Sequence, residues 1–237
     1  MIVTPKIVSV PSPNHSPRNG VKIQAIVEHI TQGGMPDGWF ANPASGVSST
    51  YSVAKAGAVH QHVQDSEAAW ANGIPDEAWQ NGKLVSCDHY VNGQKVHWDA
   101  PANPAAVVMQ NYGINANRWA LSIEHEGSTP DTPQGVQLDA SVNLTAWLCQ
   151  QHGLVPSRQT IIRHSDIGGH LYCPGWSDAF LDSYIQQVKK VMGMVRPTEP
   201  LPPWIQAISH SKPTLQMVRA EVAKVLAQLD QAIAALP

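Results

Sequence analysis

Apolar residues follow the spacing of β-strands in several short segments of the chain. Residues 21–30 (VKIQAIVEHI) are largely apolar at both odd and even positions, which is typical of a strand buried on both faces, and His29 lies near its end. Three further segments have strand patterns: a hairpin at 47–64, and single strands at 118–127 (RWALSIEHEG) and 159–164 (QTIIRH). The two single strands end close to Glu124 and on His164.

Two longer segments have the three-to-four-residue spacing of amphipathic helices. The first covers 138–152 and is followed by Gly153, the expected C-terminal stop. The second covers 180–192, where aromatic and aliphatic residues form one stripe. Because strands and helices alternate, we expect an α/β fold in which a mixed central β-sheet is flanked by helices.

The C-terminal part of the chain has a different composition. Residues 196–204 (RPTEPLPPW) contain four prolines, which predicts a stiff linker after a domain at 1–195. Residues 205–237 are then expected to form one amphipathic helix, because their apolar residues follow a heptad-like spacing. Three roles stay open for this helix: folding back on the domain, self-association as a coiled coil, or docking to a wall or membrane.

Composition and charge exclude several classes of protein. The 237 residues have a formal net charge of -3, and Lys and Arg form no stripe, so we expect no nucleic-acid binding. No segment approaches the roughly 20 apolar residues of a membrane span. Prolines also interrupt the first 20 residues before the apolar centre of a signal peptide. We therefore expect no stable membrane insertion, and a protein that is cytoplasmic as synthesised.

The segment 163–176 (RHSDIGGHLYCPGW) places two histidines close to a cysteine. A catalytic zinc ion needs three protein ligands and one open position. His164 at a strand end, Cys173 nine residues later and His29 at the end of another strand could converge on one ion. The odd number of cysteines, three, argues against a disulfide framework and leaves at least one thiol free.

Two other interpretations of these residue types remain open at this point. His60 and His62 are two residues apart on one strand, so they point to the same face and could also bind a metal. A polar strand face is the favoured explanation, because no third ligand is near in the sequence. Cys173 and His164 could instead form a nucleophilic pair. Pro174 weakens that hypothesis, because a reactive cysteine usually opens a helix whose N–H groups stabilise its thiolate.

Five motifs in order resemble one known family. IVEHIT, SSTYSVAKAGAVHQHV, AAWANG, NRWALSIEHEG and RHSDIGGHLYCPGW are similar to the motifs of the type 2 N-acetylmuramoyl-L-alanine amidases, whose zinc amidase fold is shared with peptidoglycan recognition proteins and many phage endolysins. The resemblance spans about residues 18–190. It implies one Zn²⁺ per chain held by His29, His164 and Cys173, with Glu124 as the general acid/base; Glu126 is its competitor on the same face of the strand.

The chain departs from the family pattern around the predicted substrate groove. Leu171 stands where many members have Lys or Arg, which leaves His170 as the nearest candidate for contact with the oxyanion. WANG replaces a Trp-His-Ala-Gly motif, and a tyrosine replaces a histidine in the sheet motif. Candidates for the groove, each with an alternative role in the core or in a turn, are Tyr51, Trp70, Asn72, Trp98 and Trp119.

The resemblance implies hydrolysis of the amide between N-acetylmuramic acid and L-alanine in bacterial peptidoglycan. An endolysin released with the help of a holin-type partner fits the expected lack of a signal peptide. Two alternatives are a cytoplasmic amidase that recycles soluble muropeptides and a non-catalytic peptidoglycan-binding module; retention of Cys173 argues against the latter. The segment 72–104 lengthens the chain before the glutamate-bearing strand and is a candidate to shape the groove.

Overall fold

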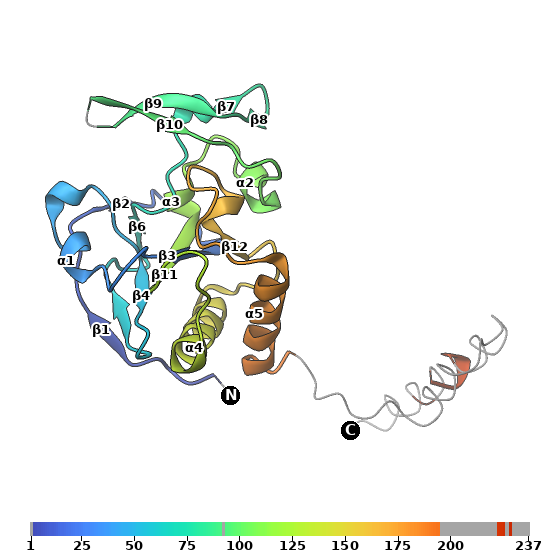
Figure 1. Cartoon of the computed structure of the whole chain (residues 1–237). Coiled ribbons are helices and arrows are strands. Elements are labelled where there is room, and N and C mark those ends of the chain that lie inside the picture. Colours follow the sequence, from blue (N-terminus) through green and yellow to red (C-terminus); the bar gives the residue numbers. More distant parts are fainter. Residues whose placement is uncertain (1, 92, 195–221, 226–227, 229–237) are drawn as a thin grey trace. The chain divides into compact units, whose positions relative to one another are not determined.

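The computed structural model describes residues 2–91, 93–194, 222–225 and 228 (Figure 1). By its internal contacts the chain divides into two units, Met1–Val195 and Arg196–Pro237. In the second unit, residues 222–225 and 228 are helical, within the helix expected at 205–237. The expected linker at 196–204 and the rest of that helix lie outside the described residues, so self-association through it stays a prediction.

A six-stranded mixed sheet forms the centre of the first unit (Figure 1). Its strands, in spatial order, are β1 (Ile7–Ser9), β5 (Val59–Gln61), β4 (Tyr51–Val53), β11 (Ala120–His125), β3 (Ala25–Ile30) and β12 (Ile161–Arg163). The pair β4–β5 is antiparallel and is the predicted hairpin, whereas the other neighbours run parallel. The expected α/β class with a mixed central sheet is confirmed.

Both faces of the sheet are covered, because successive side chains of a strand point to opposite sides. Ile26 and Leu121 belong to a core cluster that includes residues of α4 (Gly135–His152) and α5 (Asp178–Val191), two helices that pack against each other. The neighbouring Val27 belongs to a second cluster on the other face. The pattern of 21–30 is therefore that of a strand buried on both sides, and all six residues of β3 are buried.

The ends of the predicted elements shift by a few residues. Helix α4 begins at Gly135 and ends where Gly153 adopts a left-handed conformation with φ 66°, as expected for a C-terminal glycine. Helix α5 begins at Asp178, and the preceding residue, Ser177, caps it: its side chain accepts a hydrogen bond from the Phe180 N–H. Among the described residues, no helix is long and apolar enough to cross a membrane.

The remaining elements lie in the connections. They are β2 (His15–Pro17) paired with β6 (Glu67–Ala69), α1 (Asp37–Phe40), η1 (Pro43–Ser45), η2 (Asp76–Ala78), the pair β7 (Trp79–Gln80) and β8 (Lys83–Leu84), the pair β9 (Cys87–Val91) and β10 (Gln94–Trp98), α2 (Ala106–Gln110), α3 (Ala116–Trp119) and η3 (His164–Asp166). Strands β7 to β10 lie together at the end of the first unit away from α4 and α5 (Figure 1). All four strands belong to the segment 72–104.

Candidate metal centre

Three adjacent parallel strands bring the predicted ligands to one edge of the sheet. His29 on β3 lies directly opposite Glu124 on β11. On the other side of β3, strand β12 ends at Arg163, and His164 opens the turn η3 immediately after it. Because carboxyl ends of parallel strands share an edge, residues far apart in the sequence meet here. Cys173 is brought back to the same place by a loop in which its carbonyl accepts a hydrogen bond from the Ser165 N–H at 2.8 Å.

His29, His164 and Cys173 form the only group of three or more potential metal-ligating side chains found among the described residues. Their ligand atoms all lie within 4.8 Å of one another. His29 Nδ1 is 3.8 Å from Cys173 Sγ, and the two imidazole rings have centroids 4.4 Å apart. Both histidines are buried and the cysteine is half-buried. The group of three proposed from the sequence is thus assembled in space.

The His29 ring is oriented by Asn72. The Nε2 of His29 donates to the Asn72 side-chain oxygen at 2.8 Å, which directs Nδ1 toward Cys173. Asn72 is itself held in place, since its backbone N–H and that of Ala71 donate to the Asn117 side-chain oxygen. Asn72 is buried behind the histidine, so the expectation that it lines the substrate groove is wrong. Its position is that of a residue that fixes the orientation of a ligand.

Burial keeps the three side chains uncharged in the protein alone. Desolvation lowers the pKa of His29 to about 3 and holds the pKa of His164 well below its usual value, so both imidazoles are neutral, as metal ligands must be. Burial, together with the Glu124 carboxylate, raises the pKa of Cys173 to about 12. No Lys or Arg is among the described residues that line the cavity around Cys173, so none compensates a thiolate there. A bound cation would supply that charge and stabilise the deprotonated thiol.

Glu124 is the carboxylate beside this group. Its Oε1 lies 3.8 Å from His29 Nδ1, and its Oε2 is buried without a hydrogen-bond partner among the described residues. Burial raises the pKa of Glu124 to about 8, close to the neutral range in which a general acid/base is most effective. The side chain is therefore free to exchange a proton with a molecule bound at the centre.

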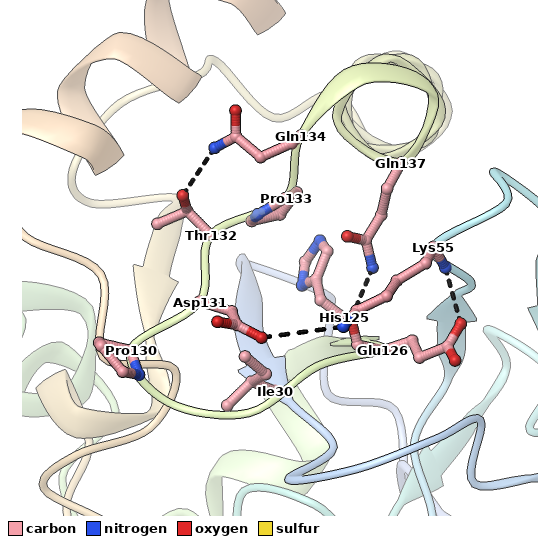
Figure 2. A pocket seen from close by; sticks show the side chains of 10 residues that line it. All are labelled: Ile30, Lys55, His125, Glu126, Pro130, Asp131, Thr132, Pro133, Gln134 and Gln137. Atoms are coloured by element: carbon pink, nitrogen blue, oxygen red, sulfur yellow. Dashed lines mark hydrogen bonds and ion pairs between the residues drawn. The ribbon is translucent and has the colours of Figure 1, made fainter.

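Glu126, the competitor, is attached elsewhere. Its carboxylate accepts a hydrogen bond from the Lys55 N–H at 2.7 Å, and its carbonyl accepts one from Gln137 Nε2 at 2.9 Å. Figure 2 shows both contacts at the rim of a separate cavity of about 610 Å³. The Lys55 ammonium extends across this cavity toward Asp131 (Figure 2). Glu124 and Glu126 share a face of one strand, but their neighbours give them different surroundings: the carboxylate of Glu126 has a hydrogen-bond donor, and Oε2 of Glu124 has none among the described residues.

The metal centre opens into a cavity of about 280 Å³. Its walls include His170, whose ring centroid is 5.0 Å from that of His164, and the half-exposed Trp70. Their predicted places beside the centre agree with the structure, while their roles stay predictions. Other lining residues are Thr31, Gln32, Pro36, Trp39, Phe40, Val47 and Ser48.

Tyr51 and Trp119 are corrections to the predicted groove. Trp119 has no exposed surface and its indole N–H donates to the Ile114 carbonyl at 3.1 Å. Tyr51 is 1% exposed, and its hydroxyl donates to Asp65 at 2.8 Å. Each aromatic ring fills the core and satisfies its polar atom internally. Neither side chain can contact a polymeric substrate in this structure.

The alternative pair of histidines has other partners. His60 Nδ1 lies 2.9 Å from the Asp37 carboxylate, which is an ion pair when the ring is protonated. His62 is buried, with Nδ1 3.0 Å from the Val10 carbonyl and Nε2 2.8 Å from the Ser52 hydroxyl. Their ring centroids are 6.5 Å apart. Asp37 lies near both rings, but these three residues are not among the groups of the described part of the chain whose ligand atoms are close enough to hold one metal ion. The two rings serve hydrogen bonding in the β4–β5 region.

Two features of the centre were missed by sequence reasoning. One is the bond from His29 to Asn72, 43 residues away, for which the sequence carries no local signal. The other is the reason for the paired glycines at 168–169. Trp98 packs so closely on this backbone that a Cβ at Gly169 would lie 2.7 Å from the indole nitrogen. Glycine is required there for close approach.

Comparison with known proteins shows which sequences and structures are similar to this chain. The sequence model of the N-acetylmuramoyl-L-alanine amidase family matches residues 19–176. Among solved structures, a mutant endolysin from Bacillus subtilis has 15% identity and a TM-score of 0.51, covering 78% of this chain and 99% of that chain. A mutant of PlyL has 18% identity and a TM-score of 0.50, covering 78% and 98%.

At these identities the structural likenesses concern the fold. No curated protein matches the sequence significantly. The match to the family model shows membership of a family, because it covers about two thirds of the chain. The matched range also contains every residue of the centre, from His29 to Cys173. The chain belongs to the N-acetylmuramoyl-L-alanine amidase family.

Proposed function

We propose that this protein is a zinc-dependent amidase that hydrolyses the bond between N-acetylmuramic acid and L-alanine in bacterial peptidoglycan. One observation carries the proposal: two neutral imidazoles and a thiol converge beside an unpartnered carboxylate, in a cavity open to solvent, within a chain of this family. Three ligands and an open position are what a catalytic zinc site needs.

The donor set fits zinc. Nitrogen and sulfur ligands suit this borderline-soft ion, whereas Mg²⁺ and Ca²⁺ prefer oxygen. In a tetrahedral site with Zn–N of about 2.0 Å and Zn–S of about 2.3 Å, neighbouring ligand atoms lie roughly 3.3–3.6 Å apart. The 3.8 Å between His29 Nδ1 and Cys173 Sγ is close to this spacing. The Asn72 bond to Nε2 leaves Nδ1 of His29 as the ligand atom.

Zinc held by His29, His164 and Cys173 would polarise the amide carbonyl and lower the pKa of a water molecule. Glu124 then accepts a proton from the attacking water and delivers it to the leaving nitrogen of L-alanine. Its buried and unpartnered Oε2 favours the proton-carrying form between these two steps. His170, on the wall of the same cavity, is the neighbouring side chain that can donate to the developing oxyanion.

The test measures zinc content and bond cleavage together. The purified protein is expected to hold one zinc per chain and to release new L-alanine amino groups from isolated peptidoglycan, and a chelator should abolish the release. Cys173→Ala should lose both zinc and activity, whereas Cys87→Ala, at a free thiol outside the centre, should keep both. Full activity in Cys173→Ala would refute the metal assignment. Zinc without cleavage would indicate a binding module.

We propose an endolysin-like role in cell-wall lysis, with access to the wall through a holin-type partner, on the basis of the five sequence motifs. Parallel assays on intact cell walls and on soluble muropeptides test it. A lysin clears a suspension of walls, whereas a recycling enzyme acts only on soluble fragments. Strong preference for soluble fragments would replace the lytic role by recycling.

A further inference from the structure

The β9–β10 hairpin is fixed to the loop that carries the metal ligands. Trp98, the last residue of β10, is buried against Gly168 and Gly169, where no side chain would fit. The Gly169 N–H donates to the Asp99 carbonyl at 2.8 Å. Both glycines lie between His164 and Cys173 in the sequence. The base of the hairpin therefore has a defined position next to the metal centre.

The two faces of the hairpin differ in chemistry. Antiparallel pairing places His89 opposite Val96, and Tyr90 opposite Lys95. One face carries His89, Val91 and Val96, and these three side chains line a cavity. On the other face, the Lys95 ammonium pairs with Asp88 at 2.7 Å, next to the exposed Tyr90. The apolar side chains thus point to the cavity, although Val91 and Val96 are 46% and 41% exposed.

This hairpin cavity, of about 380 Å³, adjoins the cavity of the metal centre. Five residues line both: Val47, Trp70, Ala71, His164 and His170. Among its described lining residues there is no Lys, Arg, Asp or Glu; three valines, an alanine, two indoles, four imidazoles, four glycines and one amide surround it. The hairpin cavity can accept an uncharged ligand with apolar faces and a few hydrogen-bonding groups. Its imidazoles and amide offer hydrogen bonds, and the one histidine that faces carboxylates, His97, already pairs with Asp88 at 2.7 Å and with Asp99 at 3.4 Å.

We propose that the hairpin cavity binds the neutral N-acetylated sugars that adjoin the cleaved amide, so that the β9–β10 hairpin is a wall of the glycan subsite. This inference rests on the proposed function. Peptidoglycan extends from that amide in two chemically different directions. The stem peptide carries carboxylates, which are costly to desolvate without a cation. The glycan is neutral at its N-acetyl groups and presents C–H faces to aromatic and aliphatic side chains such as Trp70 and Val96.

The kinetics of one double variant and one single control variant test the proposal. Val91→Ser with Val96→Ser removes the apolar wall, and Tyr90→Ser on the opposite face is the matched control. The substrates are N-acetylmuramoyl dipeptide, with one sugar, and a soluble glycan of several disaccharides bearing the same peptide. The double variant should lose about tenfold in kcat/KM on the long glycan, mainly through KM, because two apolar contacts are removed. Its kcat/KM on the single-sugar substrate should be unchanged, and Tyr90→Ser should leave both values unchanged.

Equal losses on both substrates, or no loss on the long glycan, would overturn the inference. A binding experiment keeps it testable even if no amide is cleaved. Tetra-N-acetylchitotetraose should quench tryptophan fluorescence of the zinc-loaded full chain, and the double variant should bind it about tenfold more weakly than Tyr90→Ser does. L-Alanyl-γ-D-glutamate should not compete. Absence of sugar binding, or competition by the acidic dipeptide, would reject the glycan subsite, whereas sugar binding without hydrolysis would reject only the proposed activity.

Discussion

Replacing Asn72 by alanine should weaken zinc binding more than it weakens the fold. The hydrogen bond from His29 Nε2 to Asn72 is 2.8 Å long, and both residues are at most 2% exposed, so water cannot readily take the place of the amide. Without zinc, the ring of His29 can change its tautomer or rotate. With zinc on Nδ1, the proton must be on Nε2, and the variant leaves that buried N–H without a partner.

The cost of an unsatisfied buried donor is about 1–3 kcal/mol, which corresponds to a factor of about 5–150 in Kd. Because the cost arises mainly in the zinc-bound state, Asn72→Ala should raise the Kd for zinc by about 10–100-fold, the usual effect of losing such a partner. The assay is competition with a chelator of known affinity. Asn72→Asp retains an acceptor at the same place and should bind zinc within about threefold of wild type.

Asn111→Ala is the matched control for the loss of a buried amide. The Asn111 side chain bonds to Gln24 and to the Val107 carbonyl, and it contacts none of the metal ligands. The variant should lower the free energy of unfolding with and without zinc, and leave the Kd unchanged. If Asn72→Ala bound zinc within twofold of wild type, or Asn111→Ala lost as much affinity, the reasoning about tautomer control would be refuted.

Three further predictions concern other parts of the molecule. Glu124→Gln should keep zinc but lower kcat by about 10²–10⁴-fold, whereas Glu126→Gln should stay within a few-fold of wild type; the reverse result would exchange their roles. Gly168→Ala should reduce the free energy of unfolding, measured by chemical denaturation, by at least about 2 kcal/mol, because φ is +122° and a tryptophan ring occupies the space of the new Cβ. In the control Gly34→Ala the new Cβ meets no neighbour, so the same assay should show little effect. Burial lowers the pKa of His62 from 6.5, so below pH 6.5 the unfolded chain binds a proton that the folded chain does not. In zinc-free denaturation, the free energy of unfolding of wild type should therefore fall by up to about 1.4 kcal/mol per pH unit relative to that of His62→Gln, and equal slopes would contradict this.

The sequence could predict the strand ends because burial on two faces leaves a clear pattern. His29 and His164 were placed at strand ends by such patterns, and the structure confirms that both lie at one edge of the sheet. Periodicity could not separate Glu124 from Glu126, since residues two apart share a face of a strand. The difference comes from the Lys55 backbone, which reaches Glu126 from another strand connection.

Tertiary contacts decided what the patterns left open. Tyr51 and Trp119 have side chains that suit either a sugar-binding groove or a core, and only packing shows that they are buried. The β9–β10 hairpin was not predicted, because its alternation of charged and apolar residues is short. The Asn-Gly pair at 92–93 is the sequence signal for this hairpin, and it depends on turn chemistry instead of on periodicity.

The order of strands in the sheet has a consequence for synthesis of the chain. Strand β3 lies between β11 and β12, both of which are made much later, and the last ligand follows at Cys173. A nascent chain therefore carries the apolar segment 25–30 with both strand edges unpaired until about half of the 237 residues have emerged, and with one edge unpaired until about two thirds have emerged. Such non-local pairing is slow to form and exposes edges that favour aggregation. It also means that truncated translation products cannot assemble the centre, so hydrolytic capacity would arise only once synthesis of the domain is nearly complete.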